Sequence, residues 1–236
     1  MKYLVCNFKN KLLKEDIIKY NNRLGDIETK VKLVLIPPVC YLSMFDKNGY
    51  ELGVQDISSF MDKTITGEIE AFQVKSLGVT YVIIGHSERR NYKHEINIDF
   101  INKINNANEV GLKVIYCIGE SLSYRENGNT YMVLEKQISE VLNNVSLKNI
   151  MIAYEPVWAI GTGVTPEIDE INETINFIKT TIMEKYEYKV DCLYGGSVNN
   201  ENIESLCKIK NINGFLVGGA SLDVTKVKDI LVEMEK

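Results

Sequence analysis

The chain has 236 residues, of which 45% are hydrophobic and 25% are charged, and its formal net charge is −5. This is the composition of an ordinary globular protein that is long enough to bury a large core. The acidic balance argues against nucleic acid, which proteins usually meet with a basic face, and no apolar run approaches the roughly 18 residues that suggest a membrane span. We therefore expect neither nucleic acid nor a membrane as a partner.

Short apolar runs alternate with longer amphipathic patterns from one end of the chain to the other. The runs are rich in Val, Ile and Leu with little polar alternation, which is typical of parallel strands covered on both faces. They are Tyr3–Cys6, Leu33–Ile36, Leu52–Gln55, Tyr81–Ile84, Val114–Cys117, Ile150–Tyr154, Val190–Leu193 and Phe215–Val217.

Helical periodicity fills the stretches between these runs. Ile171, Ile175, Ile178 and Ile182, for example, recur every three or four residues among polar side chains. Eight strand–helix units in a chain of this length predict an α/β fold of the (β/α)₈ TIM-barrel class, with eight parallel strands inside outer helices, as a single domain over residues 1–236. An open, doubly wound parallel sheet is the alternative that periodicity alone does not reject.

The amino-terminal sequence and the cysteines bear on location. Residues 1–7 lack the apolar stretch and small-residue cleavage site of a signal peptide. Five cysteines, scattered through mostly apolar segments, indicate small buried side chains rather than a disulfide framework. We expect a cytoplasmic protein.

Polar residues and glycines follow five of the expected strands. In isolation, each has a plain structural explanation: a lysine in a solvated loop, a hydrogen-bonded histidine, a carboxylate at a helix boundary, or a glycine in a turn. In a barrel, however, the carboxyl ends of all strands share one face, where active sites are built. The joint occurrence on that face favours a functional site made of Asn7 and Lys9, His86 and Glu88, Glu155, Gly195 to Ser197, and Gly218 with Gly219.

The chemistry of this set is coherent. Glycines after the last two strands expose backbone N–H groups that bind phosphate, and Ser197 adds a hydroxyl. A carboxylate, Glu155, suits proton abstraction next to a carbonyl, while His86 and Lys9 stabilise charge that develops on oxygen. The stretch Pro156–Gly163, apolar in its middle with glycines at its end, is typical of a lid that excludes water.

Metal and nucleotide chemistry are not indicated. His94 and Glu95 lack the second histidine of a zinc-binding helix, and no Cys/His cluster has ligand spacing. Gly161-Thr162-Gly163 alone is too short for a nucleotide-binding loop. We expect no metal and no cofactor.

Six segments, taken together and in order, resemble triosephosphate isomerases. The two around His86 and Glu155 are highly specific, whereas the glycine segments alone would be weak. The resemblance implies a TIM barrel that interconverts dihydroxyacetone phosphate and D-glyceraldehyde 3-phosphate through an enediolate, in glycolysis and gluconeogenesis, without a cofactor. The segments are Asn7–Lys9, Gly85–Arg90, Tyr116–Glu120, Ala153–Gly163, Tyr194–Val198 and Gly214–Leu222.

The same resemblance implies a role for each site residue. Glu155 is the base that moves a proton between two carbons, and His86 is the electrophile, working as a neutral imidazole at a helix start. Lys9 holds phosphate and enediolate charge, and Glu88 positions Lys9 or the histidine. Substrate contacts come from Asn7, Lys9, Gly161, Ser197, Gly218 and Gly219.

The family is usually a homodimer, joined by a loop that reaches into the neighbouring subunit. That loop resembles Gln55–Glu68, with Thr66 near the neighbour's site. This part departs most from the family: Lys63-Thr64-Ile65 stands where Gly-Ala and an aromatic are common, and Asp56 replaces an Asn. We expect a homodimer through this loop, whose strength depends on whether the neighbour's pocket fits Ile65 in place of the aromatic side chain.

Two other functions remain open from the residues themselves. A different phosphate-binding barrel, such as a sugar-phosphate epimerase, would share the glycine features but not the combination of Asn7, Lys9, His86 and the segment after Glu155. A catalytically silent barrel that acts as a binding protein is the third possibility, and the complete set of Glu155, His86 and Lys9 argues against it as the main role.

Overall fold

Eight parallel strands close into a barrel, in chain order, with β1 paired to β8. The computed structural model describes residues 2–236 except 46–48, 62 and 162–165. The closed barrel confirms the predicted fold class and excludes the open sheet. The strands are β1 (Tyr3–Asn7), β2 (Lys32–Ile36), β3 (Glu51–Val54), β4 (Tyr81–Ile84), β5 (Lys113–Ile118), β6 (Ile150–Tyr154), β7 (Cys192–Tyr194) and β8 (Gly214–Val217).

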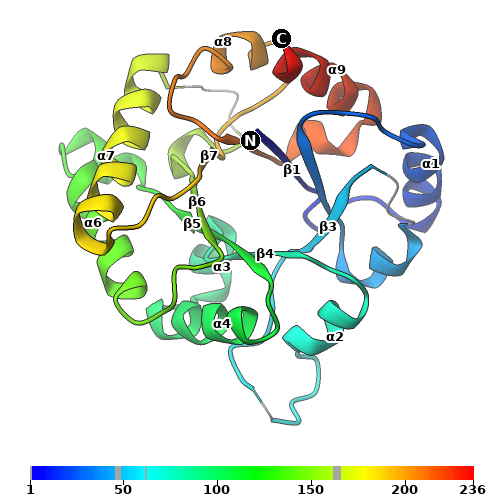
Figure 1. Cartoon of the computed structure of the whole chain (residues 1–236), viewed down its shortest axis with the longest axis horizontal. Helices are drawn as coiled ribbons and strands as arrows, with labels where there is room; N and C mark the ends of the chain where they lie inside the picture. Colours follow the sequence, from blue (N-terminus) through cyan, green and yellow to red (C-terminus); the bar gives the residue numbers. More distant parts are fainter. Residues whose placement is uncertain (1, 46–48, 62, 162–165) are drawn as a thin grey trace.

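Helices surround the barrel as an outer ring (Figure 1). The longer ones bury one apolar stripe against the strands, as the 3.6-residue periodicity of α7 predicts. They are α1 (Lys14–Leu24), α2 (Ala71–Ser76), α3 (Ser87–Lys93), α4 (Asn97–Glu109), α5 (Leu122–Glu126), α6 (Thr130–Leu142), α7 (Ile168–Tyr186), α8 (Ile203–Leu206) and α9 (Val224–Glu235), with 3₁₀ turns η1 (Val39–Met44), η2 (Val157–Ala159) and η3 (Gly219–Leu222).

Six of the eight strands differ in their bounds from the expected ones, most of them by one residue at an end. Val190–Leu193 was expected as a strand, but β7 runs over Cys192–Tyr194, because the pairing of β7 with β6 begins at Cys192. Gln55 lies beyond β3, where its side-chain amide donates to the carbonyl oxygens of Lys9 (2.6 Å) and Ile36 (3.3 Å). A polar side chain that bridges two loops in this way is not part of the ladder of strand hydrogen bonds.

The strands carry buried side chains on both faces, so the molecule has two apolar layers. One lies between the barrel and the helices. The other fills the barrel interior and consists of Val5, Val34, Ile36, Tyr81, Ile83, Ile115, Cys117, Met151, Ala153, Leu193 and Leu216. Because side chains alternate along a strand, Asn7 faces the same way as Val5, toward the interior at the carboxyl end.

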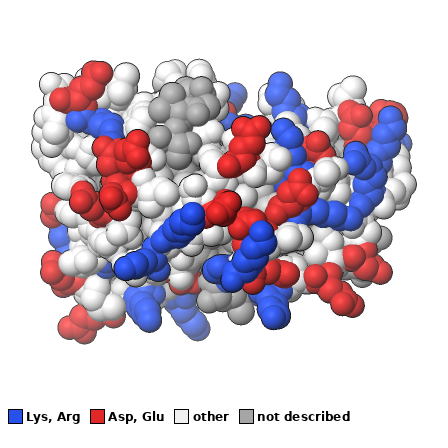
Figure 2. Space-filling model, turned by 90° about the horizontal axis from the view of Figure 1, so that it is seen from above, with Lys and Arg blue, Asp and Glu red and all other residues white. Residues whose placement is uncertain are grey.

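Lys and Arg are interspersed with Asp and Glu on the face shown in Figure 2. On that face neither sign forms a broad continuous patch. Separately, the helices of the described residues include none that is both long and apolar enough to cross a membrane.

Candidate active site

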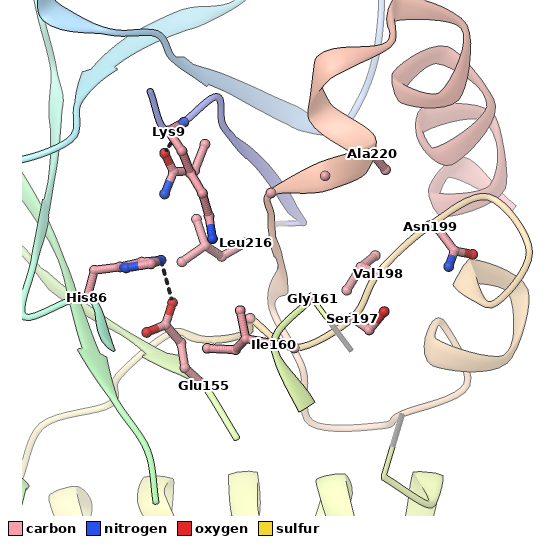
Figure 3. Close-up of a pocket in the computed structure, with 15 residues that line it drawn as sticks. Lys9, His86, Glu155, Ile160, Gly161, Ser197, Val198, Asn199, Leu216 and Ala220 are labelled. Atoms are coloured by element: carbon pink, nitrogen blue, oxygen red, sulfur yellow. Dashed lines mark hydrogen bonds and ion pairs between the residues drawn. The ribbon is translucent and has the colours of Figure 1, made fainter. Parts of the chain in front are cut away.

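A cavity of about 220 Å³ opens at the carboxyl end of the barrel. It brings together residues that follow strands β1, β4, β6, β7 and β8, as Figure 3 shows for the labelled side chains. The lining residues are Asn7, Lys9, His86, Glu155, Ile160, Gly161, Gly195, Gly196, Ser197, Val198, Asn199, Leu216, Gly218, Gly219 and Ala220.

Lys9 extends from a tight turn after β1. Its backbone has a φ of +50°, which a non-glycine residue rarely adopts. The carboxamide of Asn7 accepts a hydrogen bond from the backbone N–H of Lys9 (2.9 Å), and Gln55 donates to its carbonyl, so both sides of the strained residue are held. The Lys9 ammonium lies 2.7 Å from Oε1 of Glu88. Glu88 therefore contacts Lys9 directly, whereas its other oxygen is 3.7 Å from His86 Nδ1.

His86 caps the amino terminus of α3. Its Nδ1 accepts a hydrogen bond from the backbone N–H of Glu88 (3.2 Å). A ring nitrogen that accepts carries no proton, so the neutral ring has its proton on Nε2. Nε2 in turn points toward Glu155 at the edge of the cavity (Figure 3). The helix start thus fixes both the tautomer and the direction of the imidazole.

Glu155 follows β6 directly and is 2% exposed. Its Oε1 lies 3.3 Å from His86 Nε2, and its Oε2 accepts a hydrogen bond from the backbone N–H of Ser87 (3.1 Å). A buried carboxylate needs such donors, because burial without them costs several kcal/mol. The thiol of Cys117 lies beneath, and burial, together with the charge of Glu155, raises the pKa of Cys117 well above its ordinary value.

The glycines at the rim are required by close packing as well as by backbone exposure. A Cβ at position 196 would lie 2.1 Å from the hydroxyl of Tyr194, and one at 195 would lie 3.0 Å from Cγ of Glu155. At 218, a Cβ would lie 3.3 Å from Cε of Lys9, whereas none of the described atoms would crowd a Cβ at 219. At the first three positions a side chain would crowd neighbouring atoms of the site, whereas Gly219 has open space around its backbone.

The segment after Glu155 forms the short 3₁₀ turn η2 and then borders the cavity. Trp158 in η2 donates from Nε1 to Oε1 of Glu120 (3.0 Å), which also accepts from the Tyr154 hydroxyl (3.2 Å). Burial raises the pKa of Glu120, although these donors oppose the shift. Gly161 is exposed and lines the cavity. The end of the expected lid, Thr162 and Gly163, lies outside the described residues.

The loop after β3 projects outward beyond the ring of helices (Figure 1). Thr66 and Ile65 are exposed in this loop, Ile65 to 38%. At its base, Asp56 pairs with Lys103 and with Arg89 (2.7 Å to each). Asp56 and Arg89 border a second hollow of about 560 Å³. Within this single chain, Thr66 therefore lies outside the group that surrounds Glu155.

Several lining residues were not expected from the sequence. Leu216 is one of them, and it could have been found because it faces the barrel interior two residues after Gly214 in β8. Gln55 does not line the cavity but holds the turn of Lys9, and it could have been found as a polar residue just past the end of β3. Asn199 carries no comparable signal, because it lies in the irregular stretch between β7 and α8.

The arrangement suits a small, phosphorylated carbonyl compound. A carboxylate, a neutral N–H donor and an ammonium group surround one side of the cavity, and glycine-rich backbone surrounds the other. Within the described part of the chain, no three His, Cys, Asp or Glu side chains are grouped to hold a metal ion.

Comparison with known proteins points the same way. The family model described as "Triosephosphate isomerase" matches residues 2–234. Relatives named triosephosphate isomerase include one from Thermoanaerobacter pseudethanolicus, 43% identical over 206 residues, or 83% of each chain. The relative from Dictyoglomus thermophilum is 41% identical over 88% of each chain. The relative from Neurospora crassa is 37% identical over 92% of each chain. The chain therefore belongs to the triosephosphate isomerase family.

Proposed function

We propose that this protein is a cofactor-independent aldose–ketose isomerase that interconverts dihydroxyacetone phosphate and D-glyceraldehyde 3-phosphate, a reaction of glycolysis and gluconeogenesis in the cytoplasm. The observation that carries the proposal is the group at the cavity: Glu155 lies 3.3 Å from His86 Nε2, and Lys9 extends into the same space. The reaction moves a proton between adjacent carbons and transfers no electrons to another molecule, so these side chains suffice.

The phosphate group binds at the glycine-rich side. Gly218 and Gly219 follow β8 at the start of η3, and Ser197 follows β7 on the same rim. Gly161 completes this side from the segment after Glu155. Backbone N–H groups and one hydroxyl provide donors for phosphate oxygens, and Lys9 supplies the charge.

Proton transfer takes place on the opposite side. Glu155 removes a proton from one carbon and returns it to the next, while the Nε2–H of His86 donates to the oxygens where charge develops. Asn7 and Lys9 add a second set of donors. In this structure both Glu155 oxygens face the start of α3, at Ser87 N and His86 Nε2, so the carboxylate must turn from these donors toward the substrate before it acts.

The test is a coupled assay that follows dihydroxyacetone phosphate as it forms from glyceraldehyde 3-phosphate. Purified wild type and Glu155→Gln are compared at equal concentration, because the amide keeps the shape but loses the basic oxygen. We expect a slowing by several orders of magnitude, on the order of 10³-fold or more. A folded wild type without isomerase activity would contradict the proposal, and an active Glu155→Gln variant would contradict the assignment of the base.

We further propose a homodimer through the Gln55–Glu68 loop, with Thr66 of one subunit near Asn7 and Lys9 of the other. The exposure of Ile65 (38%) and the hollow beside Arg89 and Glu68 support this, since a second copy of the loop would cover both. Ile65→Asp should favour monomers and lower activity at low protein concentration, measured by sedimentation and the coupled assay. Thr64→Asp, beside it, is the matched control for added charge. A concentration-independent dimer of full activity in Ile65→Asp would contradict this interface.

A further inference from the structure

The segment that follows Glu155 links the proposed base to the rim of the cavity. It runs from Pro156 through η2 to Ile160 and Gly161, which line the cavity. Near its start its backbone is tied down where Val157 N–H donates to the carbonyl of Glu120 (3.0 Å). A tilt of this segment would therefore move the base and the rim together.

Trp158, in the middle of η2, is held on two sides. The edge of its indole donates to Glu120, as described above. Its face carries the guanidinium of Arg125, whose Cζ lies 4.6 Å from the ring centroid. A cation over an indole face is the strongest arrangement of its kind among the aromatic side chains. The position of Trp158 thus depends on where the guanidinium is fixed.

Arg125 is itself fixed to α7. Its Nη2 lies 2.7 Å from Oε2 of Glu170, in the first turn of that helix, and its Nη1 lies 3.8 Å from Glu120. The same Glu170 oxygen accepts a hydrogen bond from the backbone N–H of Glu167 (3.2 Å), so it also caps the helix start. One planar group, 23% exposed, therefore connects Trp158, at the beginning of the segment, to the helix that begins after it.

We propose that Arg125 is a positioning residue for proton transfer, which holds Trp158, and through it the stretch from Glu155 to Gly161, against the first turn of α7. The inference rests on the isomerase function proposed above. Arg125 acts through Trp158 and does not line the cavity. A lysine cannot replace it fully, because an ammonium pairs with Glu170 but lacks the flat face that covers the indole.

Most of the phosphate side should be spared when Arg125 is changed, because Ser197, Gly218 and Gly219 follow other strands and only Gly161 lies on the held stretch. We therefore expect Arg125→Met to lower kcat on the order of 10- to 100-fold with little change in KM, as a displaced base would. An enediolate held less well also loses phosphate by elimination, so inorganic phosphate released per turnover should rise.

Trp158 provides a direct readout, because it is the single tryptophan of the chain. Its fluorescence is recorded with and without sn-glycerol 3-phosphate, which has the phosphate of the substrate but no carbonyl to react. In Arg125→Met we expect emission at longer wavelength in the free protein and an altered response to the ligand. The control is Lys185→Met, which removes an equally short ion pair (2.7 Å to Glu135) at the far end of α7.

Arg125→Lys separates positioning from stability, and also serves if Arg125→Met does not fold. We expect a thermal midpoint near that of wild type but the kcat and emission of the methionine variant. The inference is overturned if Arg125→Lys has wild-type kcat and emission, or if Arg125→Met resembles Lys185→Met in both. An inactive wild type would instead overturn the proposed function, and the fluorescence comparison would still be decided on its own.

Discussion

The amino and carboxyl ends of the barrel carry the same kinds of side chain, but these side chains do different things at each end. At the amino end, Lys32 lies 2.6 Å from Glu51, Thr80 donates to the other oxygen of Glu51 (2.8 Å), and Lys113 donates to the hydroxyl of Tyr81 (3.3 Å). Four of these five residues begin a strand. Each of these polar groups therefore has a partner on or beside a neighbouring strand.

At the carboxyl end, lysine and carboxylate groups border a cavity instead. Lys9 is paired with Glu88, and Glu155 is paired with His86 and a backbone N–H. Lys9, His86 and Glu155 nevertheless also line the cavity of about 220 Å³. The residue types do not distinguish the two ends. What distinguishes them is the space in front of the charged groups and the glycine backbone opposite, which together leave room for a substrate.

The largest expected difference between the ends is in catalysis. Lys9→Met should lower kcat/KM by roughly 10²–10³-fold or more, because the cavity loses its positive charge. Lys113→Met, the matched lysine at the amino end, should leave kcat/KM unchanged and at most lower the thermal midpoint by a few degrees. Steady-state kinetics and thermal unfolding of both variants test this contrast. Equal losses of activity in the two would contradict the division between the ends.

The pKa values of one carboxylate at each end are also shifted in opposite directions. Burial acts to raise the pKa of Glu51, but the hydrogen bonds from Lys32 and Thr80 outweigh it, and the pKa is lowered below its ordinary value of 4.5. At Asp56, near the carboxyl end, burial dominates over Lys103 and raises the pKa from 3.8 to about 6.

These shifts predict how the free energy of unfolding depends on pH. A lowered folded-state pKa means that Glu51 stabilises the protein above the unfolded pKa and that this contribution is lost as pH falls below about 4.5. A raised one means that the contribution of Asp56 is fully present below 3.8 and lost as pH rises through about 6. From these two groups we expect the greatest stability at about pH 4 to 4.5, with a loss on the order of 1–3 kcal/mol as pH rises from there to about 6 and little further change above it.

Urea unfolding at a series of pH values measures this dependence of stability on pH. Two variants show which carboxyl group causes the loss of stability on each side of the maximum. Asp56→Asn should abolish the fall in stability between about pH 4 and 6, and Glu51→Gln should weaken the fall at more acid pH. In the resemblance drawn from the sequence, Asp56 replaces an Asn, so the first variant introduces that residue. A profile that Asp56→Asn leaves unchanged would show that the buried carboxylate is not its source.

Much of the barrel could be predicted from the sequence because its signal is local. A strand such as Ile150–Tyr154 is continuously apolar within itself, and α7 carries its buried stripe within its own 19 residues. The order of strands in a parallel barrel then follows the chain, so the end at which Asn7, His86 and Glu155 gather could be inferred without any pairwise contact.

Contacts between distant loops could not be predicted in the same way. Gln55 holds the turn of Lys9 across 46 positions, and Arg125 meets Trp158 and Glu170 from a five-residue helix with no strong pattern. Each depends on side-chain direction after the barrel has closed, which periodicity does not encode. The roles of the cavity residues remain predictions until variants are measured.

The smallest expected effect concerns backbone strain at and away from the site. Lys9 and His94 have similar positive φ values, +50° and +54°, but Lys9 extends into the cavity, whereas His94 is exposed at the end of α3. Strain is tolerated at Lys9 because Asn7 and Gln55 hold it and its charge faces the substrate. Glycine adopts such a conformation without a steric penalty, so His94→Gly should stabilise the protein by about 0.5–1 kcal/mol with unchanged kcat.

Glu187→Gly, at the similarly left-handed end of α7 (φ +52°), is the parallel case. Thermal unfolding of both variants tests this prediction. A lower midpoint in both would mean that the additional chain entropy lost on folding outweighs the relieved strain.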